Sequence, residues 1–183
     1  MPISYVDEVV TRYLMKDGYV ITKGIWFSLP REKTGKKVSG WSDIDIFAVK
    51  PNKPSLIVQC KSFLGTESSE KIVRKILIWF EYAINFLKND KFYKGWLSNN
   101  PQKILVVDHS VIKTEEKLKK YGIDIWHYED KLKELLRHLK EKDDDYKEKG
   151  QRGKEEDTLL RIIADMIRRR MISKEIFNDK KLI

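Results

Sequence analysis

The chain has 183 residues, of which 41% are hydrophobic and 36% charged, and its formal net charge is +9. This length supports one main domain with an appendage, and the hydrophobic content excludes an intrinsically disordered chain. The positive charge favours a polyanionic partner, nucleic acid above all, although a soluble basic protein without such a partner can have the same composition.

Cysteine content and hydropathy exclude several other classes. The single cysteine, Cys60, excludes an internal disulfide and a cysteine-rich zinc site. The first residues, MPISYVDEVV, lack the charged and apolar regions of a signal peptide, and no apolar run approaches the roughly 18 residues of a membrane span. We therefore expect a cytoplasmic protein with no membrane partner and no organic small-molecule cofactor.

The first third of the chain predicts one helix followed by three strands. Apolar residues recur at helical spacing over 5–16, and DGY at 17–19 supplies a stop. Residues 19–29 are rich in β-branched and aromatic side chains and predict a first strand. Two further strands are expected at 43–49 and 55–61, joined by the turn KPNKP.

The next part of the chain predicts alternating helices and strands. A long amphipathic helix is expected over 69–87, an apolar strand at 103–107, a charged helix at 114–121 and a strand at 123–128, before a last helix that ends near Lys142. Apolar strands joined by a helix are typical of buried parallel pairs. The sequence therefore predicts an α/β fold with a mixed central sheet, in the order helix, three strands, helix, strand, helix, strand, helix.

A change of composition marks the expected domain boundary. We expect a main domain over 1–142, a charged linker over 143–157, where apolar residues lose their periodicity, and a helical tail over 158–183. About 26 residues cannot form a core of their own. The tail must therefore pack on the main domain, on a second copy of the chain or on a ligand.

The second and third predicted strands carry polar side chains at regular intervals. Side chains alternate across a strand, so Asp43 and Asp45 are expected on one face, and Ile44 and Ile46 on the other. The same rule places Gln59 with Lys61. If the two strands pair, Asp45, Gln59 and Lys61 are expected together on one polar face. One reading is a half-exposed sheet that turns its polar face to water. The other is a site for a hard cation, since carboxylate and amide oxygens are ligands that Mg²⁺ accepts.

The spacing of these residues resembles a nuclease motif. The run SDID, thirteen residues and then QCK is similar to the core motif of the PD-(D/E)xK nuclease superfamily, in the QxK form of Mrr-type restriction endonucleases. GWSDIDIFAV also resembles a strand of archaeal Holliday-junction resolvases. The resemblance implies a restriction-endonuclease-like core and a Mg²⁺- or Mn²⁺-dependent endonuclease acting on DNA.

The resemblance also implies roles for individual residues. Asp45 would be the central metal ligand, Gln59 a second ligand and the Cys60 carbonyl a third. Lys61 would position the attacking water or stabilise charge on the phosphate. Because the family commonly has an acid where Gln59 stands, weaker metal binding is expected. Cys60 itself is expected to point into the core as a small apolar group.

These families also carry an acid on the first helix. Asp7 matches it by its spacing to Val10, Leu14 and Gly18. Glu8 competes for this role. At 100° per residue, Asp7 lies near the edge of the apolar face and Glu8 points away from it, which favours Asp7; a shift of the helix boundary would reverse the choice.

Two basic segments are candidates for nucleic-acid contact. One comprises Arg31, Lys33, Lys36 and Lys37, and the other comprises Arg168, Arg169 and Arg170. The first leads into the strand of Asp45 and could hold a phosphate backbone. The arginine run fits DNA contact, a homodimer surface or a solvated helix end equally well.

Two functions compete with catalysis. The first is a nucleic-acid-binding module of the same fold in which the weakened acidic set no longer holds a metal. The second is an assembly subunit that recruits a partner through its C-terminal helix.

Overall fold

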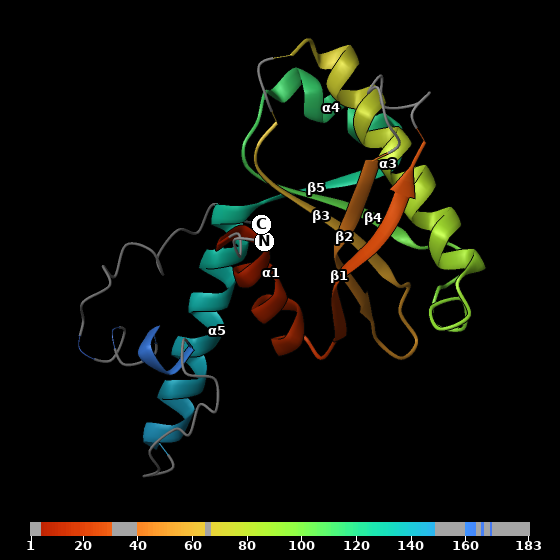
Figure 1. The fold of residues 1–183 in the computed structure, drawn as a ribbon. Coiled ribbons are helices and arrows are strands. Elements are labelled where there is room, and N and C mark those ends of the chain that lie inside the picture. Colours follow the sequence, from red (N-terminus) through yellow and green to blue (C-terminus); the bar gives the residue numbers. More distant parts are fainter. Residues whose placement is uncertain are drawn as a thin grey trace. The chain divides into compact units, whose positions relative to one another are not determined.

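The computed structural model describes residues 5–30, 40–64, 67–148, 160–163, 166 and 169 (Figure 1). The chain forms two compact units, Met1–Tyr128 and Glu129–Ile183. Across the described part of the chain, no helix combines the length and the apolar content needed to cross a membrane. Every strand of the sheet lies in the first unit.

The first unit begins with one helix and three strands and continues with alternating helices and strands. In chain order these elements are α1 (Tyr5–Lys16), β1 (Val20–Leu29), β2 (Gly40–Val49), β3 (Leu56–Phe63), α3 (Ser69–Asn89), β4 (Gln102–His109), α4 (Ile112–Lys120) and β5 (Ile123–His127). Their order is the one predicted from the sequence.

The five strands form a single mixed sheet in the order β1-β2-β3-β4-β5. β1, β2 and β3 pair in antiparallel fashion, whereas β3, β4 and β5 pair in parallel. Helices cover both faces of this sheet (Figure 1). The predicted α/β class, the mixed sheet and the parallel pairing of β4 with β5 are therefore confirmed.

Two hydrophobic clusters, one on each face, hold the sheet between its helices. We call them the α3-side cluster and the α1-side cluster, after the helix that packs in each. β4, which lies between β3 and β5, supplies both clusters, because Leu105 and Val107 pack on the α3 side while Ile104 and Val106 pack on the α1 side. This alternation explains why β4 has a continuous apolar run rather than an amphipathic pattern.

α1 lies on the sheet through an apolar stripe and is fixed at both ends. Val6, Val10 and Leu14 are buried at helical spacing. The helix ends at Lys16, and Gly18 follows in the turn with a φ of +83°, which favours glycine. At the other end, the Tyr5 hydroxyl donates a hydrogen bond of 2.5 Å to Asp108 near the end of β4. The first turn of α1, with its two acids, is thereby held at that edge of the sheet.

β1 and β2 change faces at the same level of the sheet, contrary to the expectation of regular alternation. Ile21 packs on the α1 side but Ile25 on the α3 side, and between them Gly24 has a φ of +64°. In β2, Ile44 packs on the α3 side and Ile46 on the α1 side. The prediction that Ile44 and Ile46 share a face was therefore wrong, because an irregularity interrupts both strands.

α5 (Tyr128–Glu148), which belongs to the second unit from Glu129 on, continues beyond its predicted end near Lys142. An ion pair of 2.9 Å between Lys140 and Asp144, one helical turn apart, accompanies the extension. Residues 143–148 are therefore helical, where the sequence predicted a linker. Residues 160–163 are helical as well, as expected for the tail.

The two basic segments are largely outside the described residues. The residues that fall outside the described ranges are Arg31, Lys33, Lys36, Lys37, Arg168 and Arg170. Arg169 is described and exposed. Their assignment to nucleic-acid contact therefore stays a prediction.

Candidate functional site

β2 and β3 separate in the middle of the sheet. They pair at three levels only, which are Ile46↔Val58, Phe47↔Ile57 and Ala48↔Leu56. Beyond these levels β2 stays paired with β1 as far as Gly40, and β3 stays paired with β4 as far as Phe63. We call this separation the fork. Asp45 and Gln59 are the first residues of the two strands beyond the paired levels.

The carboxylate of Asp45 replaces a main-chain partner at the fork. Its Oδ2 accepts a hydrogen bond of 2.7 Å from the backbone N–H of Cys60. Burial raises the pKa of Asp45 to about 6, although the Cys60 hydrogen bond and the charge of Lys61 act in the opposite direction. The nearby acids Asp43 and Asp7 raise this pKa further. At neutral pH the ionised Asp45 carboxylate is thus buried with too little positive charge around it, and a bound cation would stabilise it.

Gln59 is buried with an oxygen that no described group satisfies. Its side chain is 6% exposed, and Oε1 has no hydrogen-bond partner. Its neighbours Val58 and Cys60 both pack with the α1-side cluster, so alternation directs Gln59 to the α3 side. Unsatisfied buried oxygens of this kind are rare in folded proteins. Gln59 therefore has an acceptor available for a cation or a ligand.

Asp45 reaches the fork from the other face, so the expectation that Asp45 and Gln59 share one polar face was wrong. Ser42 accepts a hydrogen bond from a side chain of α3, and Ile44 packs in the α3-side cluster. Alternation therefore turns Asp43 and Asp45 toward the α1 side. This placement agrees with the finding that the charge of Asp7, in α1, raises the pKa of Asp45. A cation bound by both Asp45 and Gln59 would have to lie between the separated strands.

The two α1 acids differ in how far their oxygens are engaged. Glu8 is held by Lys23 at 3.1 Å and by Arg12 at 2.5 Å, one contact for each carboxylate oxygen. Burial acts to raise the pKa of Glu8, but these two cations hold it below its ordinary value. Asp7 Oδ2 lies 3.3 Å from Lys23, while Asp7 Oδ1 is buried without a partner. The packing therefore favours Asp7 over Glu8 as the acid that acts at the fork.

Lys23 is a site residue that the sequence did not reveal. Its ammonium group bridges Asp7 and Glu8, and these contacts raise its pKa although burial acts to lower it. Because the strand changes face at Gly24, the next side chain on the same side of the sheet as Lys23 is that of Trp26 rather than that of Ile25. A glycine inside a strand pattern is a known sign of a bulge, and Gly24 could have indicated it.

Cys60 and Lys61 directly follow Gln59 in β3. Lys61 is exposed, and its positive charge acts on the Asp45 carboxylate. Cys60 packs against the α1-side cluster, as predicted. Burial, followed by the charges of Asp45 and Asp7, raises the pKa of the Cys60 thiol well above its ordinary value. Cys60 is thus unsuited to act as a nucleophile.

A metal at the fork would need ligands beyond acidic side chains. Within the ranges that the structure describes, no group of three His, Cys, Asp or Glu side chains could hold a metal ion. An amide oxygen, a main-chain carbonyl and waters would therefore have to complete any coordination shell.

Comparisons with protein-family models, with curated proteins and with solved structures found no significant match to this chain. Any functional assignment consequently depends on the residues at the fork.

Proposed function

We propose that the protein is a Mg²⁺-dependent nuclease that hydrolyses phosphodiester bonds, acting on DNA at the fork. One observation carries the proposal. Asp45, with a pKa of about 6, and Gln59, with an unsatisfied buried oxygen, stand at the level where β2 and β3 separate. Buried polar groups with a shifted pKa or without a hydrogen-bond partner are often found at functional sites. The resemblance of SDID and QCK to a nuclease motif supports the same assignment.

The donor set fits a hard cation such as Mg²⁺ or Mn²⁺. Asp45 would supply a carboxylate oxygen, Gln59 an amide oxygen and Cys60 its main-chain carbonyl. Asp7 Oδ1 is a further buried oxygen without a partner, and its charge acts on Asp45. As part of the same proposal, the five-stranded sheet and its helices correspond to a restriction-endonuclease-like core.

Each residue has a separate task in hydrolysis. The chemistry that Mg²⁺ would supply, if held by these residues, is a lowered pKa of a bound water and neutralisation of charge on a phosphodiester oxygen. Lys61 orients the attacking water, or stabilises the charge that develops as the phosphorus–oxygen bond breaks. Lys23 holds the α1 acids in place beside Asp45. The basic segments 31–37 and 168–170 would contact the phosphate backbone without reading sequence.

A panel of labelled DNA and RNA substrates tests the proposal. Single strands, duplexes, flaps and four-way junctions are incubated with the purified chain in Mg²⁺, in Mn²⁺ and in EDTA. We expect cleavage of at least one DNA form with either metal, and none in EDTA. Lys61→Ala should abolish this cleavage without changing the thermal midpoint, because Lys61 is exposed. Cleavage that persists in Lys61→Ala would rule out the assigned role.

A second function, nucleic-acid binding without catalysis, is favoured by a separate observation. Among the described residues, no group of three His, Cys, Asp or Glu side chains could hold a metal ion. In addition, Lys23 already forms ion pairs with the two acids of α1, Asp7 and Glu8. In this case the fork would hold no metal. Calorimetric titration with Mn²⁺ separates the two functions, since the binding module predicts no heat that depends on Asp45.

A further inference from the structure

Two tryptophans lie exposed on neighbouring strands beyond the fork. Trp26 in β1 is 52% exposed, and Trp41 in β2 is 72% exposed. In the register of the two strands, Trp26 is opposite Asp43, and Ser28 is opposite Trp41. The two indoles are therefore diagonal neighbours, with Cα atoms about 7–8 Å apart.

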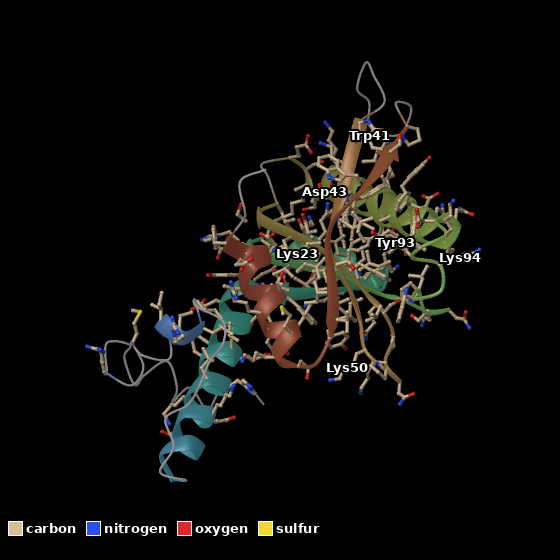
Figure 2. All side chains as sticks on the ribbon, turned by 60° about the horizontal axis from the view of Figure 1, so that its bottom comes forward. Lys23, Trp41, Asp43, Lys50, Tyr93 and Lys94 are labelled. Carbon is tan, nitrogen blue, oxygen red and sulfur yellow. The ribbon has the colours of Figure 1, made fainter. Side chains whose placement is uncertain are left out.

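Both indoles lie on the α1 side of the sheet, the side of Asp45. Ile25 and Phe27 flank Trp26 and pack in the α3-side cluster, so Trp26 must point the other way. Ser42 contacts α3, which turns Trp41 to the same side. Figure 2 shows Trp41, Asp43 and Lys23 following one another along the β1–β2 pair toward α1. The face that carries the tryptophans thus leads directly to the fork.

Both indoles stand outside the network of aromatic contacts. Among the described residues, the ring contacts join other aromatic side chains, and Trp26 and Trp41 take part in none of them. A single exposed aromatic is common and needs no explanation. Two large rings side by side on one open face, next to a candidate active site, indicate a binding surface.

We propose that Trp26 and Trp41 form a stacking platform for unpaired nucleobases, so that the substrate is single-stranded or locally unpaired nucleic acid. The inference rests on the proposed function at the fork and names its substrate class. Every base has a π-face, so exposed indoles bind single strands without reading their sequence. A strand stacked on the platform would extend along the same face toward Asp45.

The polar groups between the indoles favour bases as the occupant. Asp43 repels phosphate but can accept hydrogen bonds from the amino and imino groups of bases, so the strand would turn its bases toward the sheet.

A protein partner fits the surface less well. Specific protein–protein interfaces bury at least about 1,200 Å² in total, and two indoles separated by polar side chains supply only a small part of that area. A second copy of this chain is an outcome that the experiment below would detect.

Binding to an abasic strand separates stacking from charge attraction. We would measure fluorescence anisotropy with a labelled 16-nucleotide oligothymidine and with an abasic oligonucleotide of equal length, both in EDTA. Wild type should bind the base-bearing strand more tightly. Trp26→Ala and Trp41→Ala should each weaken that binding about tenfold and leave binding to the abasic strand unchanged, since one stacked base contributes about 1–3 kcal/mol.

Matched variants control for the loss of any exposed indole. Trp96 is 66% exposed and lies before β4, at the other end of the sheet from Trp41. Trp96→Ala should therefore bind both strands as wild type does. Trp41→Phe should retain most of the preference, because a phenyl ring still stacks. Equal thermal midpoints would show that all variants are folded.

Several results would overturn the inference. Equal affinity of wild type for the two strands would do so, as would the same loss in Trp96→Ala as in Trp41→Ala. Self-association of wild type that Trp41→Ala abolishes, without any preference for bases, would assign the face to a second copy. Because binding is measured in EDTA, base-dependent binding without cleavage would contradict the nuclease alone, and cleavage without base dependence would contradict the platform alone.

Discussion

The backbone N–H of Cys60 donates its hydrogen bond to the side chain of Asp45, at 2.7 Å, at the level where β2 and β3 stop pairing. A side-chain carboxylate thus serves as the acceptor at the point where the strand ladder ends. The arrangement opens the sheet next to Gln59 without leaving the Cys60 N–H unsatisfied. It also buries the Asp45 carboxylate, which raises its pKa to about 6.

Asp45→Asn should stabilise the metal-free protein at alkaline pH. Below the ordinary pKa of 3.8, Asp45 is protonated in both the folded and the unfolded state, so its ionisation does not lower the free energy of unfolding. Between 3.8 and about 6 only the unfolded state has lost the proton, so the stability of wild type falls as pH rises. Above that range the loss is complete, on the order of 3 kcal/mol for a shift of this size.

Urea unfolding in EDTA measures this effect. We expect Asp45→Asn to be more stable than wild type by on the order of 3 kcal/mol at pH 8, and by about a third of that at pH 4.5. Asn retains an oxygen that can accept the Cys60 hydrogen bond. Asp43→Asn, on the same face, is the matched control. It removes a charge that helps to raise the Asp45 pKa, so it should stabilise the protein only slightly, by less than about 1 kcal/mol. A variant less stable than wild type at pH 8 would contradict the burial cost assigned to Asp45.

Metal binding should depend on pH through the same carboxyl group. A cation competes with the proton on Asp45, so we expect the apparent Mn²⁺ affinity to fall about tenfold between pH 7 and pH 5. Calorimetry at pH 6 in two buffers of different ionisation enthalpy should show proton release on binding. In Asp45→Asn any residual affinity should be flat across this range, and a flat profile in wild type would remove Asp45 from the ligand set.

Gln59→Glu should exchange stability for metal affinity. The substitution keeps the shape of the side chain but adds a second buried carboxylate close to Asp45, so the metal-free protein should become less stable by about 1–3 kcal/mol at pH 8. Mn²⁺ should raise the thermal midpoint of Gln59→Glu by more than that of wild type, because an added carboxylate strengthens the ligand set. Equal midpoint shifts in the two proteins would place the metal elsewhere.

The α1 acid can be identified by a pair of isosteric variants. Asp7→Asn should lower Mn²⁺ affinity about tenfold, since Asp7 has a buried oxygen without a partner and its charge reaches Asp45. It should also lower the pKa of Asp45, which the charge of Asp7 helps to raise. Glu8→Gln should stay within about twofold of wild type, because both Glu8 oxygens contact other cations. The opposite order of the two variants would assign the role to Glu8.

Local sequence pattern predicted the elements of the fold well, because each element has a simple periodicity. The stripe of Val6, Val10 and Leu14 identified α1, and the apolar run of β4 identified a strand buried on both faces. The end of α5 was predicted too early, since residues 143–148 have no apolar periodicity. Charged side chains such as Lys140 and Asp144 accompany that part of the helix instead.

The candidate site was less predictable, because it depends on where strands depart from regular pairing. Spacing brought Asp45, Gln59 and Lys61 together as candidates, and that choice remains to be tested. Alternation alone could not reveal that Ile44 and Ile46 pack on opposite faces, since the cause is an irregularity shared with Gly24 on a different strand. Nor could it reveal the role of Lys23, which depends on how α1 packs on β1.

The claim that Asp45 organises a phosphodiester-cleaving site is tested most directly by single-turnover cleavage. The measurement compares wild type, Asp45→Asn and Asp43→Asn at pH 8 with Mg²⁺, on whichever substrate of the panel wild type cleaves fastest. We predict that wild type and Asp43→Asn cleave at rates within about tenfold of each other, and that Asp45→Asn, although more stable, loses at least about a thousandfold in rate. Cleavage by Asp45→Asn at the rate of Asp43→Asn would contradict the account.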